Sequence, residues 1–299
     1  MENQKNNSII EKLDKVPSSE DSIEELYTIF NSLKNYALPL IKVNIEPGAF
    51  IIRQRINEEG AEFSYIHELS YPPTQFTKYG RANIPYHPMF YGCTFGMEQT
   101  NVEPRILTLL ETSEFAQDTD TIGIQRSTCS RWNVIDSLQL LALPFSNSYS
   151  SPIDEIKQIQ DEWNKEIGKV NINKKALDIT IYMSKEIAKK AIADSDYFKI
   201  AHFVYFLLYL NENTKDYDGI IFPSVAANGD GYNVAIKPEV VDKKLQFDVA
   251  ALCYLVKNKE KEHLDIISLS TEHDEYGYLS FKKEDNYNEE TYKEFIFVN

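Results

Sequence analysis

Three arginines stand where the neighbouring residues predict burial or an ordered loop. Arg53 and Arg55 alternate with other residues in FIIRQRI, so both side chains point to one face of the expected strand. A guanidinium in such surroundings needs an anionic partner. That partner is either one of the 46 Asp and Glu carboxylates or a ligand phosphate, which the planar guanidinium binds well. Arg81, between Gly80 and Ala82 in a Pro- and Tyr-rich stretch, offers the same two alternatives.

A carboxylate and a hydroxyl occupy two further unusual positions. Glu111 lies in the apolar helical segment RILTLLETSEF. An unpaired buried carboxylate is costly, so Glu111 either pairs with an arginine or has a catalytic task. Ser224 follows the apolar run GIIFP, where a buried strand gives way to a turn. Strand ends often carry functional sites, although serine is also a common turn residue.

Metal and nucleotide-phosphate motifs are missing from the sequence. The 5 histidines show no metal-ligand spacing. His202 lies in an apolar segment and is predicted to be a hydrogen-bonded core residue. His273, between Glu272 and Asp274, is predicted to belong to a solvated turn rather than a ligand set. The histidines therefore give no indication of a metal site.

Hydrophobic periodicity predicts the elements that position these residues. A frayed end is expected to about residue 20, and then a helix from a Ser22/Glu25 capping box to Pro39. A strand over 49–56 precedes a long ordered loop over 57–98. The remaining expectations are a helix over 105–115, strands within 122–143, helices over 151–167, 176–193 and 195–211, and strands over 218–236 and after Pro238. Strands at both ends with helices between them indicate an α+β fold.

Composition restricts the class of protein. The chain has 299 residues with 31 Lys and Arg against 46 Asp and Glu, a net charge of −15, which argues against direct binding of nucleic acid. Three scattered cysteines favour a reducing cytoplasm, and no secretory signal begins the sequence. The most apolar stretch, 200–210, is about half as long as a membrane span. We therefore expect a cytoplasmic protein with no membrane partner.

Several segments, taken in order, resemble the RES-domain family of toxin–antitoxin toxins. They are FIIRQR, YGRANIPYHPMFYG, ILTLLE, and DGIIFPSV followed by NVAIKP and VVDKKL, which span about residues 49–245. The resemblance implies an ADP-ribosyltransferase-like split mixed β-sheet with surrounding helices. It also implies an enzyme that cleaves the nicotinamide–ribose bond of NAD+ and passes ADP-ribose to water or phosphate. NAD+ is then the substrate, and no metal is required.

The resemblance assigns catalytic roles to three residues of this chain. The family arginine falls on Arg53, the glutamate on Glu111 and the serine on Ser224. The spacing before the glutamate is longer than in compact members, so Glu98 and Glu103 are rival assignments. Glu111 is preferred because it alone lies in an apolar helical context.

The same resemblance assigns substrate-binding roles. Arg81 matches the basic residue of the family's GR loop, Tyr91 matches the loop tyrosine, and Arg55 lies on the same strand face as Arg53. Several relatives have a tyrosine directly after the first arginine, where this chain has Gln54. A stacking role on the nicotinamide would then pass to Tyr86, Tyr91 or another of the 19 tyrosines.

We expect an N-terminal polar segment with an amphipathic helix over 1–45, a RES-like catalytic domain over 46–246, and a β-rich extension over 247–299 packed on that domain. The resemblance implies a cognate antitoxin with a helix-turn-helix domain, and an oligomer is possible. Two other functions stay open: transfer of ADP-ribose to a protein, or a non-enzymatic interaction module. The last would gain support if Arg53, Glu111 and Ser224 lay far apart.

Overall fold

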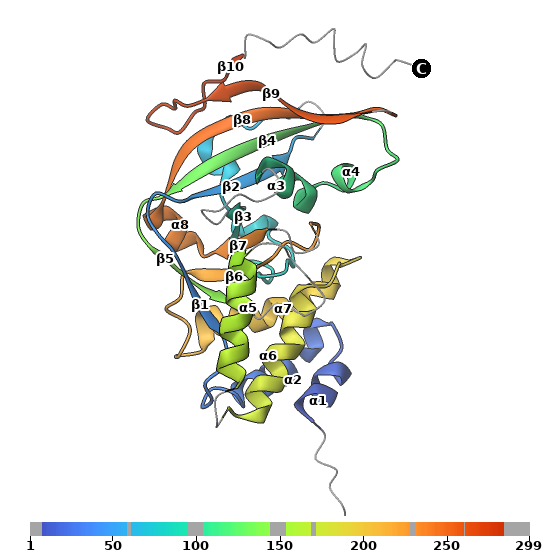
Figure 1. Ribbon diagram of the computed structural model, residues 1–299, viewed down its shortest axis with the longest axis vertical. Helices are drawn as coiled ribbons and strands as arrows, with labels where there is room; N and C mark the ends of the chain where they lie inside the picture. The colour runs from blue at the N-terminus through green and yellow to red at the C-terminus, as the bar shows by residue number, and fades with distance from the viewer. Residues whose placement is uncertain are drawn as a thin grey trace, which may run out of the picture.

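A large mixed β-sheet with helices around it forms the body of the protein (Figure 1). The computed structural model describes residues 8–58, 61–94, 104–143, 154–168, 172–227, 231–259 and 261–283. The described strands lie in the order β1-β5-β6-β7-β3-β2-β4-β8-β9-β10, and within that order only β5 and β6 run parallel. The strands are β1 (Ile41–Ile45), β2 (Phe50–Ile56), β3 (Phe90–Thr94), β4 (Gly123–Val134), β5 (Leu138–Ala142), β6 (Gly219–Pro223), β7 (Tyr232–Ile236), β8 (Leu245–Lys257), β9 (Glu262–Ser270) and β10 (Lys282–Lys283). The α+β expectation is confirmed.

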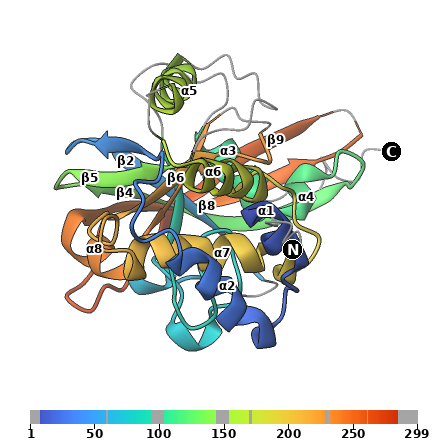
Figure 2. The same ribbon diagram turned by 90° about the horizontal axis from the view of Figure 1, so that it is seen from below.

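Helices gather mainly at the end of the sheet that carries β1, β5 and β6 (Figure 1). They are α1 (Ile9–Lys15), α2 (Ile23–Asn31), α3 (Pro104–Thr112), α4 (Glu114–Gln117), α5 (Asp154–Ile167), α6 (Lys174–Ile187), α7 (Phe198–Tyr205) and α8 (Pro238–Lys244). Viewed from below, α5 stands on one side of the molecule and α2 on the other (Figure 2). In the described part of the chain, no helix is long and apolar enough to cross a membrane.

Two apolar clusters fill the two faces of the sheet. One joins α1, α2, α6 and α7 to the face that carries Ile220 and Phe222. The other joins Trp163 of α5 and Val241 of α8 to the face that carries Ile221. Consecutive residues of β6 thus enter different clusters, as the period-2 alternation of a strand requires. Both faces of the central strands are therefore buried.

The sheet narrows at its centre, where β2 meets β3. Among the described residues, which end at Thr94 on this strand, β2 and β3 pair through Ile51 with Thr94 and Ile52 with Cys93. In contrast, β2 pairs with β4 along its whole length. Gly92 lies beside this contact, and a Cβ there would come within 2.5 Å of the Ile51 side chain. The sheet therefore consists of two halves, β1-β5-β6-β7-β3 and β2-β4-β8-β9-β10, joined by a two-pair junction.

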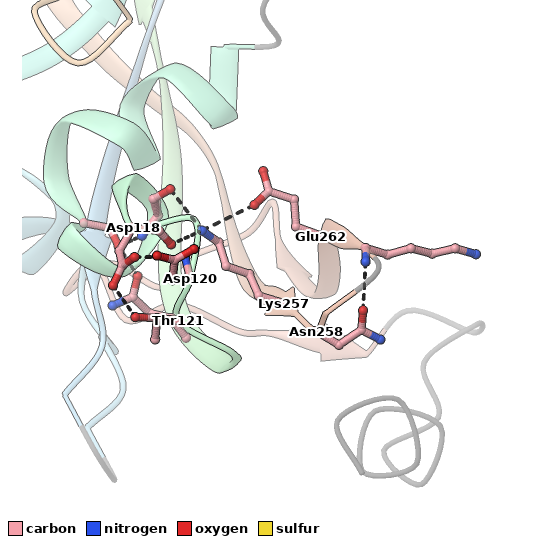
Figure 3. Close-up of polar contacts among 10 residues, drawn as sticks. Asp118, Asp120, Thr121, Lys257, Asn258 and Glu262 are labelled. Carbon is pink, nitrogen blue, oxygen red and sulfur yellow. Dashed lines mark hydrogen bonds and ion pairs between the residues drawn. The ribbon is translucent and has the colours of Figure 1, made fainter. Parts of the chain in front are cut away.

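The C-terminal strands are continuous with the rest of the sheet. β8 pairs with β4 from Leu245 to Lys257, so the expected boundary at residue 246 falls inside one strand. At its end, the Lys257 ammonium donates to the carbonyl oxygens of Ala116 (3.1 Å) and Asp118 (3.0 Å) and lies 3.3 Å from the Glu262 carboxylate (Figure 3). Its side chain is only 3% exposed. Because a buried ammonium needs such partners, Lys257 fixes the segment after α4 against β8.

The N-terminal segment differs from expectation. Residues 9–15 form α1 instead of a frayed end, because Ile9, Leu13 and Val16 recur at helical spacing and are buried against the other helices. Ser8 caps the helix by accepting from the Glu11 N–H at 3.1 Å. The expected Ser22 capping box is also wrong, since Ser22 makes no side-chain cap bond and α2 ends at Asn31, well before Pro39.

Some of the predicted strands and helices are present and others differ. The strand over 49–56 is confirmed as β2, and the strands within 122–143 as β4 and β5. The expected loop over 57–98 contains a central strand, β3, and a short helix, α8, follows Pro238. Both elements were missed because β3 has 5 residues and α8 has 7, which are too few to show a hydrophobic period. The expected N-terminus of the helix at 151–153 lies outside the described residues.

Candidate active site

Glu111 and Ser224 are in direct contact. Ser224, at the end of β6, donates from its Oγ to Oε1 of Glu111 on α3 at 2.5 Å. The Ala226 N–H donates to the same oxygen at 3.1 Å, and the Ala227 N–H donates to Ser224 Oγ at 3.2 Å. Ser224 is fully buried and Glu111 half-buried. The carboxylate is thus held in one orientation by a strand-end turn, as expected for a group with a defined task.

Helix α3 is anchored to the sheet beside the two-pair junction. The Thr108 hydroxyl donates to Gln54 Oε1 on β2 at 3.0 Å, and Gln54 Nε2 donates to Ser127 Oγ at 2.7 Å. Leu107 lies so close to Gly231 that a Cβ there would meet its methyl group at 2.3 Å. Gly231 also has a φ of +122°, which favours glycine. These contacts place the C-terminal turn of α3, and with it Glu111, over the end of β6.

Arg81 and Tyr91 hold a neighbouring loop. Tyr91, on β3, donates from its hydroxyl to Asn83 Oδ1 at 2.7 Å and accepts from the Ala82 N–H at 2.9 Å. Arg81 Nη1 donates to the carbonyl oxygens of Ile187 (2.9 Å) and Lys189 (2.5 Å) at the end of α6. In this structure Arg81 therefore binds the carbonyl end of a helix, where a cation is favoured.

Tyr197 connects these two groups. It lies in the short helix η4 (Asp194–Tyr197), and the Arg81 guanidinium sits 5.1 Å from the centre of its ring. Burial raises the pKa of the Tyr197 hydroxyl, Arg81 opposes that rise, and the negative charge of Glu111 adds to it. Tyr197 therefore packs against Arg81 and lies within electrostatic range of Glu111. Nothing in the local sequence DSDY indicated this, because the contact depends on the packing of α6 against α7.

Arg53 occupies the junction of the two half-sheets. Its pairing with Ser130 sets it on the face of β2 opposite Gln54. Nη1 donates to the Tyr91 carbonyl oxygen at 2.6 Å, just beyond the last β2–β3 pair, and the guanidinium lies 5.4 Å from the centre of the Phe90 ring. No carboxylate pairs with Arg53 among the described residues, and its buried Nε has no partner there.

The electrostatics of Arg53 follow from this position. Burial first, and the charge of Arg55 second, lower the pKa of the Arg53 guanidinium to about 10. The group is still a cation at neutral pH, held in surroundings that do not balance its charge. Among the described residues, no hydrogen bond or ion pair joins Arg53 to Glu111 or Ser224. The structure therefore brings Glu111 and Ser224 together and leaves Arg53 on the other side of β3.

The remaining candidates lie further out. Arg55 Nη1 donates to the Glu68 carbonyl oxygen, and its guanidinium lies 4.5 Å from the centre of the Phe63 ring, so protein groups satisfy it. Tyr86 is 67% exposed with a φ of 64°. Glu98 and Glu103 lie outside the described residues.

Two histidine expectations can be compared with the structure. His202 is buried, with Nδ1 2.9 Å from the Tyr27 hydroxyl and Nε2 3.2 Å from the Tyr79 hydroxyl, so the prediction of a hydrogen-bonded core residue is confirmed. His273 lies in an exposed turn in which Asp274 Oδ1 accepts from the backbone N–H of Tyr276 and Tyr278. Over the described ranges, no group of three or more His, Cys, Asp or Glu residues could hold a metal ion.

Comparison with known proteins adds no assignment. No family model matches the chain, and no curated protein matches it in sequence.

Proposed function

We propose that this protein is a RES-like enzyme that cleaves the nicotinamide–ribose bond of NAD+ and passes ADP-ribose to water or phosphate. The observation that carries the proposal is the Ser224–Glu111 hydrogen bond at the end of β6. The two residues come from segments that resemble separate motifs of one family. Their contact favours a working site, whereas the separate position of Arg53 is what the alternative of an interaction module predicts.

The chemistry needs a carboxylate close to the reacting ribose. Nicotinamide leaves NAD+ as a neutral ring, and the ribose then carries the positive charge of an oxocarbenium ion. A fixed carboxylate offsets that charge as it develops. Ser224 and Ala226 both donate to Oε1 of Glu111, and no donor among the described residues reaches Oε2. Oε2 is thus the oxygen that would accept a hydrogen bond from a ribose hydroxyl.

A second requirement is a cation for the pyrophosphate. By the resemblance we assign this role to Arg53, whose guanidinium has no carboxylate partner among the described residues. In this structure its side chain lies on the face of β2 opposite Gln54 and α3. We assign Arg81 a supporting role, since its Nη1 is engaged by the end of α6. Tyr197, next to Arg81, is the tyrosine we assign to the nicotinamide in place of the exposed Tyr86.

The shape of the sheet agrees with this proposal. Two half-sheets that meet through two residue pairs in the described part of the chain are consistent with the split sheet of ADP-ribosyltransferase-like proteins. Glu111 and Arg53 flank that junction, one from α3 and the other from β2. By the same resemblance we infer a cytoplasmic toxin that is silenced by an antitoxin with a helix-turn-helix domain.

Release of nicotinamide tests the proposal. Purified protein is incubated with NAD+, with and without phosphate, and products are separated by chromatography. We expect free nicotinamide together with ADP-ribose or its 1-phosphate, and loss of both in Glu111→Gln. The exposed Glu114→Gln, on the neighbouring helix α4, is the matched control and should retain activity.

The same experiment decides between the alternatives. Label from NAD+ that appears on a polypeptide in a cell lysate would identify a protein ADP-ribosyltransferase instead. If the wild type and Glu111→Gln were equally inert with water, phosphate and lysate proteins, the enzymatic proposal would be wrong.

A further inference from the structure

A second site candidate lies on the other face of the sheet from α3. It is a groove of 590 Å³ between the short helix η2 (Ile66–Leu69), α8 and the turn that follows β9. Its floor includes Trp132, whose ring faces the cluster that holds α5 and α8. The volume lies within the range typical of ligand sites, about 300–1,000 Å³. The proposed NAD+ chemistry uses none of its lining residues.

The groove is negatively charged and aromatic. Asp242, Asp274 and Glu275 line it together with His67 and His273, and none of its lining residues is a lysine or arginine. Tyr71 and Tyr276 contribute aromatic rings, and Tyr276 is 78% exposed. A cation that can also stack on aromatic faces is the chemical species that such surroundings attract.

One carboxylate of the groove is held in place. The Tyr71 hydroxyl lies 3.1 Å from both Oδ1 and Oδ2 of Asp242, an exposed residue of α8. Each carboxylate oxygen keeps acceptor capacity beyond this bond. A planar guanidinium, with paired N–H groups, uses two such oxygens together, whereas an ammonium acts as a point charge.

The opposite wall is built in advance of any ligand. Two backbone bonds tie the turn after β9 to η2 and the residues before it. The Ile66 N–H donates to the Gly277 carbonyl (3.0 Å), and the Leu279 N–H donates to the Ser64 carbonyl (2.8 Å). Gly277 has a φ of +80°, which a glycine adopts without strain. Because the wall is fixed by backbone bonds, binding would not have to order it.

We propose that this groove binds an arginine side chain of a partner polypeptide, with the guanidinium against Asp242 and the aliphatic stem over Trp132. A polypeptide is favoured over a free cation because the rim residues Tyr276 and Glu275 stay exposed and are free to contact the flanking chain. The site is independent of NAD+ cleavage, so either proposal can fail alone.

The two tryptophans of the chain provide the test. In the ¹⁵N-labelled protein, the indole N–H signals of Trp132 and Trp163 are assigned with Trp163→Phe and followed during titration. The ligands are end-capped glycine peptides with a central arginine, lysine or citrulline, and free arginine. We expect the Trp132 signal to shift saturably with the arginine peptide while Trp163, on α5, stays unchanged.

Ligand ranking and variants complete the test. Citrulline, which is neutral but similar in shape, should bind at least about tenfold more weakly, and lysine should fall between. Asp242→Asn and Glu275→Gln, at two exposed residues of the groove, should each weaken binding, whereas the exposed Asp161→Asn on α5 should not. Nicotinamide release should be the same in all three.

Three results would overturn this proposal. They are equal binding of the citrulline and arginine peptides, no shift of the Trp132 signal up to about 1 mM peptide, or unchanged binding in Glu275→Gln and Asp242→Asn together. Free arginine that binds as tightly as the peptide would overturn the assignment of a polypeptide ligand.

Discussion

Ser224 and Glu111 are 113 residues apart in the chain, yet the serine hydroxyl and the Ala226 N–H converge on the same carboxylate oxygen. The turn after β6 and the last turn of α3 therefore act as one unit. A change in either element moves the carboxylate.

The first prediction concerns this pair. Ser224→Ala removes one of two donors to Oε1, so we expect nicotinamide release to fall about tenfold, and Glu111→Gln to reduce it at least about 100-fold. Since both residues serve one group, the double variant should be no slower than Glu111→Gln. The rates of the four proteins form a cycle, and additive losses would show that the two residues act separately.

A second prediction separates binding from stability at Arg53. Arg53→Met keeps the stem but removes a buried charge without a carboxylate partner among the described residues. Replacing a buried charge by an apolar side chain of similar volume is often neutral or stabilising. We expect an unchanged or higher free energy of unfolding in urea, and at least about tenfold weaker NAD+ binding by calorimetry. A loss of more than about 2 kcal/mol would mean that Arg53 is chiefly structural.

Arg81 should behave in the opposite way. Arg81→Met removes two hydrogen bonds to the end of α6, so we expect a loss of about 1–2 kcal/mol in the free energy of unfolding. The Lys189 amide should exchange its hydrogen faster, and the KM for NAD+ should rise less than in Arg53→Met. Unchanged stability with a large rise in KM would instead assign Arg81 to the substrate.

A pH dependence should arise at His202. Burial lowers its pKa from 6.5 to about 4. Between these values the unfolded chain binds a proton that the folded protein does not, so the free energy of unfolding falls as the pH drops from about 6.5 to about 4. The full loss, about 3 kcal/mol, is reached below the lower pKa. His202→Gln can bond both tyrosine hydroxyls without titrating, so the difference between the two proteins in urea unfolding at pH 7 and pH 4.5 isolates this effect.

The sequence predicted secondary structure correctly where apolar or β-branched residues formed a continuous run. β2, β4 and β5 followed from β-branched and apolar runs, and His202 from its apolar surroundings. Ile9, Leu13 and Val16 also have helical spacing, but the polar residues between them led to the wrong expectation of a frayed end. β3 was missed because FYGCT has no period of its own and is identified as a strand only by its neighbours β2 and β7.

The sequence indicated which residues belong to the site better than it indicated how they are arranged. Glu111 and Ser224 each stood out as polar groups in apolar segments, and the structure brings them together. The position of Arg53 depends on where β2 and β3 stop pairing, and Tyr197 on how η4 follows α6. Neither is set by residues nearby in sequence, because both follow from contacts between distant segments.

The two-pair junction also bears on which substitutions the chain can accept. Ile51, Ile52, Cys93 and Thr94 form the narrow strip between the two half-sheets. Arg53 belongs to one half-sheet and Ser224 follows a strand of the other, so a tilt across this strip changes the spacing of these two residues. Insertions at the outer edges of the sheet lie away from this strip. A larger residue at Gly92 would clash with Ile51 and separate β3 from β2. Variation in this protein should therefore accumulate at the outer strands and be lowest along the strip.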